Sequence, residues 1–277
     1  TAAMIEPYVD KVAGRDPHAG DRGMSMVPQD ELNEAVARFD RMGLTVKFHA
    51  AGDRAVRSAL DAIAFARQEN GSYGPLHDVG HCTFAKPEDL ERAREIGATL
   101  EMSPYLWTPT AINDSITAAV GEPRIKRAWP IRDAIDAGAL VVFGSDWAVV
   151  PSVNPWIGLE TMITRERPGG SDKNFYGKSQ AVTLDEALTG FTINAARHMG
   201  RADELGKLLV GYLADFVVLD RDPWKTPVRE LHKTLVDMTA VGGKIVYQRA
   251  EAEPALSVTM FRGDFATVNS FIVSNGE

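Results

Sequence analysis

A repeated pattern of helix, glycine and short strand constrains this chain more than any other feature of its sequence. The pattern covers residues 28–49, returns over 87–102 and returns again over 130–143. In each copy a proline opens a run of apolar residues spaced three or four apart, and a glycine closes it, as expected for the two ends of an amphipathic helix. Strands that alternate with helices are typical of parallel sheets joined by crossover connections. We therefore predict an α/β fold over residues 28–200.

A fourth strand is predicted around residues 77–82, after a further amphipathic helix that carries Leu60 and Ile63 on its apolar face. The uninterrupted apolar run Leu140–Phe143 suits a strand that is buried on both faces, as in parallel sheets. Residues 1–27 show little periodicity, so we expect a loop or a poorly anchored lead-in there.

Three of the four predicted strands end on side chains that can carry out chemistry. They are His49, His81 and, after Gly144, the pair Ser145–Asp146. Active sites of parallel α/β proteins assemble at the carboxyl ends of strands, so we expect these groups to lie close together. Two imidazoles and a carboxylate suit a divalent transition metal such as zinc, which lowers the pKa of a bound water to about 7. Asp146 can instead stand beside the metal as general base and acid.

Each of these side chains also has a structural interpretation. A single histidine at the end of a strand is more often a packing residue than a ligand. Where three such groups lie on one sheet, a functional site and a packing role become equal alternatives. The other histidines lack that context and are assigned to surface or packing positions: His18, His77, His198 and His232. Three aromatic residues suit apolar packing as well as a pocket lining and stay outside the predicted site: Tyr105, Trp107 and Trp147. Cys82 has no second feature that supports a nucleophile.

The pattern changes towards the carboxyl end of the chain. Thr183 and Glu186 have the spacing of a capping box for a helix that continues through Ala195. Strands are then predicted over residues 205–208, 214–220 and 239–247, the last as a hairpin that turns on Gly242–Gly243. The predicted division is an α/β body over residues 1–204, strands of a β-sandwich over 205–250 and a tail over 251–277 that has no assignment.

Several of these motifs resemble those of one enzyme family. His49–Val56 (HAAGDRAV) resembles the fifth-strand motif of the amidohydrolase superfamily, in the form used by its family 3, which includes N-substituted formamide deformylase-like enzymes. Gly80–Cys82 resembles the sixth-strand motif, in which this family more often has Glu before the His. Gly144–Asp146 resembles the eighth-strand Ser-Asp, and residues 205–220 with the hairpin at 242–247 are similar to the return into the family's β-sandwich. The resemblance covers residues 1–250.

This resemblance implies a fold, a cofactor and a reaction. The family has a (β/α)8 barrel that binds one or two divalent metals, usually zinc, and hydrolyses amide-type C–N bonds. By resemblance, His49 and His81 would be metal ligands. Asp146 would be the ligand from the eighth strand and the proton shuttle. The expected substrate is a small-molecule amide.

The sequence departs from the family pattern in one respect. The family's barrel begins with a His-x-His pair on its first strand and carries a further ligand, a Lys or a carboxylate, on its fourth, but this sequence contains no His-x-His. Only four strand units are found where a closed barrel needs eight. We therefore expect the carboxy-terminal half of a TIM-type barrel, strands five to eight, with part of a small β-sandwich. A truncated reading frame, a processed product and an incompletely represented chain would each give this pattern.

Three functional hypotheses follow. The first is a metal-dependent amidohydrolase, present here as the part that holds His49, His81 and Asp146. The second is a catalytically inactive fragment, or a scaffold or interaction protein, that retains half of the metal site. The third is a metal-dependent phosphoesterase, which is weaker because it accounts for the groups at the strand ends but not for the return into a β-sandwich.

Composition excludes other classes of protein. The chain has 30 basic and 38 acidic residues and a formal charge of -8, which disfavours a nucleic-acid binder. Its one cysteine rules out an intrachain disulfide and suits a reducing compartment. The sequence has no apolar stretch of 18 residues, so we expect no membrane span. Its first residues are not a basic segment that leads into an apolar one, so we expect no signal peptide and a cytoplasmic protein. A half-barrel leaves two sheet edges unpaired, so we expect a homo-oligomer or a separate amino-terminal half as partner.

Overall fold

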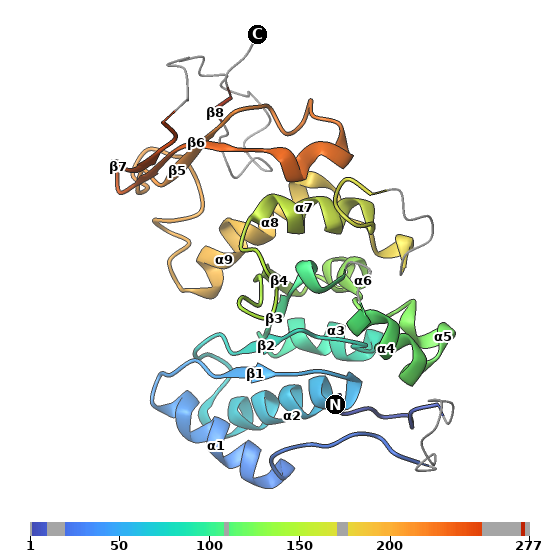
Figure 1. The fold of residues 1–277 in the computed structure, drawn as a ribbon. Coiled ribbons are helices and arrows are strands. Elements are labelled where there is room, and N and C mark those ends of the chain that lie inside the picture. The colour runs from blue at the N-terminus through green and yellow to red at the C-terminus, as the bar shows by residue number, and fades with distance from the viewer. Residues whose placement is uncertain (1, 10–19, 108–110, 171–176, 251–272, 275–277) are drawn as a thin grey trace.

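A computed structural model describes residues 2–9, 20–107, 111–170, 177–250 and 273–274 (Figure 1). Its α-helices are α1 (Gln29–Arg41), α2 (Asp53–Asn70), α3 (Pro87–Glu95), α4 (Ala111–Val120), α5 (Glu122–Ile125), α6 (Ile131–Asp136), α7 (Pro155–Thr164), α8 (Leu184–Phe191) and α9 (Ile193–His198). Short 3-10 helices are η1 (Pro104–Trp107), η2 (Lys178–Gln180) and η3 (Val228–Lys233). In the described ranges, no helix has the length and apolar character needed to cross a bilayer.

The strands form two sheets. They are β1 (Lys47–His49), β2 (Asp78–Gly80), β3 (Thr99–Met102), β4 (Leu140–Phe143), β5 (Phe216–Leu219), β6 (Val236–Val241), β7 (Lys244–Gln248) and β8 (Val273–Ser274). The first sheet has the order β1-β2-β3-β4, and all its pairings are parallel. Each of its strands lies within the range predicted from the sequence, so the α/β prediction is confirmed.

Glycines end the three helices of the repeated pattern in the way that the sequence predicts. Gly43, Gly97 and Gly138 have φ angles of 74°, 67° and 74°, in the left-handed region that a glycine adopts without a steric cost. The left-handed turn stops each helix, and the next strand begins two residues after Gly97 and Gly138 and four residues after Gly43. The periodicity and the glycine together therefore predict the helix end, and they place the strand start to within a few residues.

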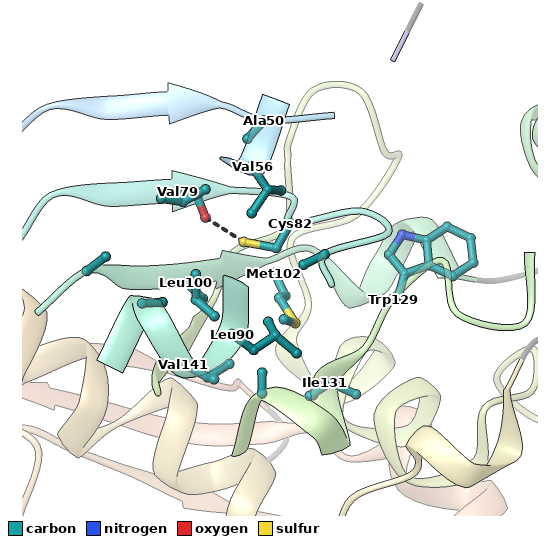
Figure 2. Close-up of a cluster of buried hydrophobic side chains, with 14 of the residues drawn as sticks. Ala50, Val56, Val79, Cys82, Leu90, Leu100, Met102, Trp129, Ile131 and Val141 are labelled. Carbon is teal, nitrogen blue, oxygen red and sulfur yellow. Dashed lines mark hydrogen bonds between the residues drawn. The ribbon is translucent and has the colours of Figure 1, made fainter. Parts of the chain in front are cut away.

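One face of the first sheet packs against the helices and forms the core (Figure 2). Val79, Leu100 and Val141 stand side by side in the register of the sheet and are at most 2% exposed. Leu90 of α3 and Ile131 of α6 pack against them. Because successive side chains of a strand point to opposite faces, the neighbours of these residues lie on the other face, which is the face that carries His49.

The described residues before α1 form a loop, as predicted, but the loop is anchored, so the alternative of a poorly anchored lead-in is wrong. The Ala3 amide donates to the Ala51 carbonyl at 2.8 Å, and the Ile5 amide donates to Asp53 Oδ1 at 2.7 Å. Met4 is 1% exposed and belongs to the core. Gly52, at φ 100°, lies so close to the Ala3 backbone that a Cβ would overlap it. These contacts join segments about 50 residues apart, so local periodicity could not predict them.

The helix predicted to continue from the capping box is divided in two. Thr183 and Glu186 form the predicted capping box at the start of α8. The helix then breaks at Thr192, whose φ and ψ are -116° and -93°, and α9 follows. The Thr192 hydroxyl donates to the Leu188 carbonyl at 2.7 Å, a side-chain bond that competes with the helical backbone and bends helices.

The second sheet lies at the carboxyl end of the described chain, beyond α8 and α9 in Figure 1, with the order β7-β6-β5-β8. The predicted hairpin is confirmed, and Gly242 and Gly243 both have positive φ, as a two-residue hairpin turn requires. The strand predicted at 205–208 is wrong, because those residues form bends. Gly206 turns into the left-handed region at φ 81° and packs on Ile193 of α9. The division at residues 204 and 205 stays a prediction, and the tail 251–277 lies outside the described residues except for β8.

Candidate active site

His49 and His81 face each other at the carboxyl edge of the first sheet. His49 is the last residue of β1 and is paired in register with Gly80, the last residue of β2, so His81 follows directly beyond it. His49 Nδ1 and His81 Nε2 are 3.1 Å apart. The two rings meet edge to face, with centroids 4.6 Å apart. The parallel register thus brings together two histidines that are 32 residues apart in the chain.

The backbone at His81 is unusual for residues other than glycine. His81 and Cys82 have φ angles of 67° and 50°, a conformation that costs of order 1–3 kcal/mol and occurs most often at functional sites. The Cys82 thiol donates to the Val79 carbonyl at 2.9 Å (Figure 2) and is fully buried, which raises its pKa well above 9.0. A buried thiol with a raised pKa is inert, so Cys82 supports the turn and is no nucleophile.

The surroundings of His81 favour its neutral form. Burial lowers the pKa of the His81 imidazole below 6.5, and the charge of Asp146 opposes that shift. Among the described residues, the buried Nδ1 atom of His81 has no hydrogen-bond partner. A neutral imidazole is the form that binds metal ions.

Asp146 lies near the histidine pair but does not join it in one cluster. It follows β4 and has a φ of 59°, so two of the three predicted ligands have left-handed backbones. The Ser145 hydroxyl accepts a hydrogen bond from the Trp147 amide at 3.2 Å and so stabilises the loop. Within the described ranges, no three His, Cys, Asp or Glu side chains come close enough together to hold a metal ion. The structure therefore brings together His49 and His81, with Asp146 acting on His81 through its charge.

The histidine pair fits two ligands of a single zinc ion. Two nitrogens that each lie about 2.05 Å from a tetrahedral zinc are about 3.3 Å from each other. The separation of 3.1 Å between His49 Nδ1 and His81 Nε2 is close to that value. The lone pairs of two nitrogens that face each other repel unless a proton or a cation lies between them. These two imidazole nitrogens therefore suit a bound metal ion.

The sequence analysis missed three charged residues beside this pair. The Lys47 ammonium forms ion pairs with Glu101 and, at 3.3 Å, with Asp78 Oδ2. Lys47 is two residues before His49 and therefore lies on the same face of the sheet. The sequence did contain a signal for these three residues, since each is a charged residue inside a short strand that is otherwise mostly apolar. A charge is seldom placed in a buried strand without a partner.

Three of the other histidines have the packing roles predicted for them. The buried His77 accepts from the Val46 amide at Nδ1 and contacts Asp40 through Nε2 at 3.0 Å. His198 Nδ1 lies 2.9 Å from the Thr99 hydroxyl, and His232 contacts Glu160. His18 lies outside the described residues.

The three aromatic residues that were left outside the predicted site differ in their burial. Tyr105 is buried, which raises its pKa to about 12, and Trp107 is buried against Arg165. Trp147, in contrast, is 68% exposed.

The chain is similar to known proteins in both sequence and fold. The "Amidohydrolase family" matches residues 1–247. The N-substituted formamide deformylase of Arthrobacter pascens is 28% identical over 250 residues, 89% of this chain and 44% of the relative. The Protein LONG AFTER FAR-RED 3 of Arabidopsis thaliana is 27% identical over 248 residues, 89% of this chain and 40% of the relative. The crystal structure of an uncharacterized metal-dependent hydrolase from Pyrococcus horikoshii OT3 is 27% identical, with a TM-score of 0.66 over 82% of this chain and 43% of that one. The chain spans less than half the length of these relatives.

Proposed function

This chain belongs to the amidohydrolase family, and we propose that it carries part of a metal-dependent site that hydrolyses amide-type C–N bonds. The observation that carries the proposal is the 3.1 Å approach of His49 Nδ1 to His81 Nε2 at the carboxyl edge of a parallel sheet. A relative named as a formamide deformylase and a structural neighbour described as a metal-dependent hydrolase support the class of reaction. The specific amide is left open by this proposal.

Each residue has a distinct role in this reaction. When bound, a divalent ion, with zinc as our first choice, supplies Lewis-acid activation of the substrate carbonyl and of water. His49 and His81 would hold that ion through Nδ1 and Nε2. Asp146, which lies outside the histidine cluster in the structure, would supply a further ligand from the end of β4 and would act as the general base, accepting a proton from the attacking water and returning it to the leaving nitrogen. The neutral state of His81 keeps its lone pair available.

We further propose that the first sheet is strands five to eight of a (β/α)8 barrel. Four parallel strands follow each other in sequence order, with helices between them, and the polar groups are at one end, as in barrels of this kind. The remaining ligands would then come from strands one to four. On this proposal residues 1–204 are barrel and residues 205–250 belong to a β-sandwich. Cys82 is the one cysteine of the chain and has no partner for an intrachain disulfide, which suits a reducing compartment, so the proposed location is the cytoplasm.

Metal analysis combined with an activity assay tests the proposal. We expect the purified chain to hold stoichiometric zinc by elemental analysis and to hydrolyse N-formyl or N-acyl amides, either alone or together with the missing strands. Removal of the ion with a chelator should abolish turnover, and added zinc should restore it. A chain that takes up no zinc and shows no turnover in either setting would favour the inactive scaffold.

Association is the second expected property. In the described part of the first sheet, β1 and β4 are the edge strands, and unpaired edges pair readily with other chains. Beyond β4 the side chains of Trp147, Val149 and Val153 are more than 60% exposed. Leaving a few hundred Å² of apolar surface uncovered forgoes several kcal/mol at about 25 cal/mol per Å². We expect a dimer, or a complex with an amino-terminal half, in sedimentation equilibrium at micromolar concentration; a compact 30.2 kDa monomer would contradict this.

A further inference from the structure

We propose that Lys47 and Glu101 are positioning residues of the hydrolytic site, whose ion pair spans three strands and fixes the strand end that carries His49 relative to the loop that carries Asp146. This inference rests on the proposed function, because a positioning role has meaning only if His49 and Asp146 act together. It concerns two side chains that lie on the same face of the sheet as His49 and that the reaction itself does not use.

The Lys47 side chain crosses the strand between its own and that of Glu101. Lys47 belongs to β1 and Glu101 to β3, and their charged groups form an ion pair across β2. Gly80 is paired in register with both His49 and Glu101, so it lies between them on the same face of the sheet. A Cβ at position 80 would lie 3.7 Å from Lys47 Cε, an ordinary van der Waals distance, so the lysine chain passes beside this residue.

The other side of the Glu101 carboxylate packs on the chain that leads to Asp146. A Cβ at Gly144 would overlap Glu101 Oε1 and would lie 3.3 Å from Glu101 Cδ. The Gly144 amide donates to the Met102 carbonyl at 3.1 Å, so this glycine continues the sheet by one residue. Two residues later the chain reaches Asp146. Glu101 therefore contacts both the lysine that precedes His49 and the backbone that precedes Asp146.

Charge explains why the pair holds its place. Glu101 and Asp78 have side chains that are 17% and 7% exposed, and the buried Asp78 Oδ1 has no hydrogen-bond partner among the described residues. Lys47 is the cation that both carboxylates contact. Removing Lys47 would leave two largely buried carboxylates without the cation that they share. Without Lys47, the Glu101 carboxylate would be repelled by Asp78 and would leave its position against Gly144.

The sheet does not need this pair for its integrity. β1, β2 and β3 are already joined by continuous backbone pairing. The Lys47 side chain is 60% exposed, and ion pairs with such exposure contribute little to stability. If the pair positions the site, its removal should therefore lower metal affinity more than it lowers thermal stability.

Cobalt binding tests this role directly. The full chain is titrated with Co²⁺, whose visible absorption reports the number and geometry of its ligands, and the melting temperature is measured beside it. We expect Lys47→Met and Glu101→Gln each to weaken Co²⁺ binding about tenfold or more, the range found for residues that support metal ligands, and to change the absorption band. Lys47→Arg should retain most of the affinity because it retains the charge. Lys225→Met removes an exposed lysine that pairs with Asp222 at 3.1 Å, and it should leave both readouts unchanged.

A cycle of substitutions at Gly144 and Glu101 tests the contact itself. Gly144→Ala should weaken Co²⁺ binding in the unaltered chain, because the new methyl group displaces the Glu101 carboxylate. In a Glu101→Ala background the same change should have almost no further effect, since the obstructing carboxylate is gone. Independent, multiplicative losses would overturn the proposed contact.

The outcomes separate this inference from the function on which it rests. If the unaltered chain takes up no Co²⁺, either alone or together with the missing strands, the proposed function fails and the positioning role fails with it. If the unaltered chain binds Co²⁺ and the Lys47 and Glu101 variants bind it equally well with the same spectrum, the proposed function stands and the positioning role alone is wrong. A fall in melting temperature without any change in affinity would likewise show a purely structural pair.

Discussion

Alanine at His49 or at His81 should remove the bound metal and lower amide hydrolysis about a thousandfold. Each substitution deletes one of the two ring nitrogens that face each other across 3.1 Å, and a single imidazole cannot hold the ion in place. The activation that a bound metal supplies is worth several kcal/mol, and about 4 kcal/mol corresponds to a thousandfold in rate. Elemental analysis of zinc and the hydrolysis rate of an N-formyl amide measure the two effects.

His198→Ala is the matched control for these variants. His198 contacts the hydroxyl of Thr99, the first residue of β3, at the end of the sheet opposite to the candidate site. It should keep its zinc and its activity. Retained turnover in both the His49 and the His81 variants would overturn the assignment of the site. Zinc lost from all three variants would show instead that histidine substitutions disturb the fold.

The outline of the candidate site could be predicted because strand ends follow from local patterns. Apolar periodicity and a closing glycine placed β1 and β4 to within a few residues, and the polar residue after each strand was then visible in the sequence. Parallel pairing adds one more step, since it places the carboxyl ends of neighbouring strands at the same edge. His49 and His81 were therefore predicted to meet, and they do.

The other features of the site depend on contacts between residues that are far apart in the sequence, which no local pattern contains. The Lys47–Glu101 pair joins residues 54 positions apart, which the register of the sheet brings to the same face across β2. The sequence pattern also treated Asp146 as equivalent to the histidines, although the described structure keeps it outside their cluster. Loop conformation, unlike strand position, is set by contacts that are distant in sequence.

The same distinction applies to the fold. The hairpin at Gly242–Gly243 was predicted because two adjacent glycines determine a tight turn locally. The Leu205–Leu208 segment was misread as a strand because its composition suits one, whereas the close contact of Gly206 with α9 requires a bend. Tertiary packing overrides local preference at such positions.

Glu160 is the buried residue whose loss should be most damaging to stability. It lies in α7, and its side chain is 0% exposed. Its Oε2 atom accepts from the His232 amide at 2.8 Å and lies 2.7 Å from His232 Nδ1, while Oε1 accepts from the Gly169 amide at 2.6 Å. One carboxylate thus connects α7, the turn that follows it, and η3, which lies between β5 and β6 of the second sheet.

Glu160→Ala should lower the free energy of unfolding by about 3–5 kcal/mol, the cost of removing one partner of a buried polar pair. The substitution leaves the amides of Gly169 and His232 without acceptors, and it leaves a cavity where the side chain was. Glu160→Gln keeps the shape and one carbonyl oxygen, so it should cost less than the alanine variant. Urea unfolding followed by circular dichroism measures both.

Glu204→Ala provides the comparison, because Glu204 pairs with Arg201 on the surface with both side chains more than 40% exposed. Exposed ion pairs are worth about 0–1 kcal/mol, so this variant should unfold close to the unaltered chain. A domain is stabilised by only about 5–15 kcal/mol in total, and a loss of the size expected at Glu160 therefore shifts the urea midpoint strongly. If Glu160→Ala instead unfolds like Glu204→Ala, the buried carboxylate does not connect α7 to η3, and the contacts of His232 must be satisfied in another way.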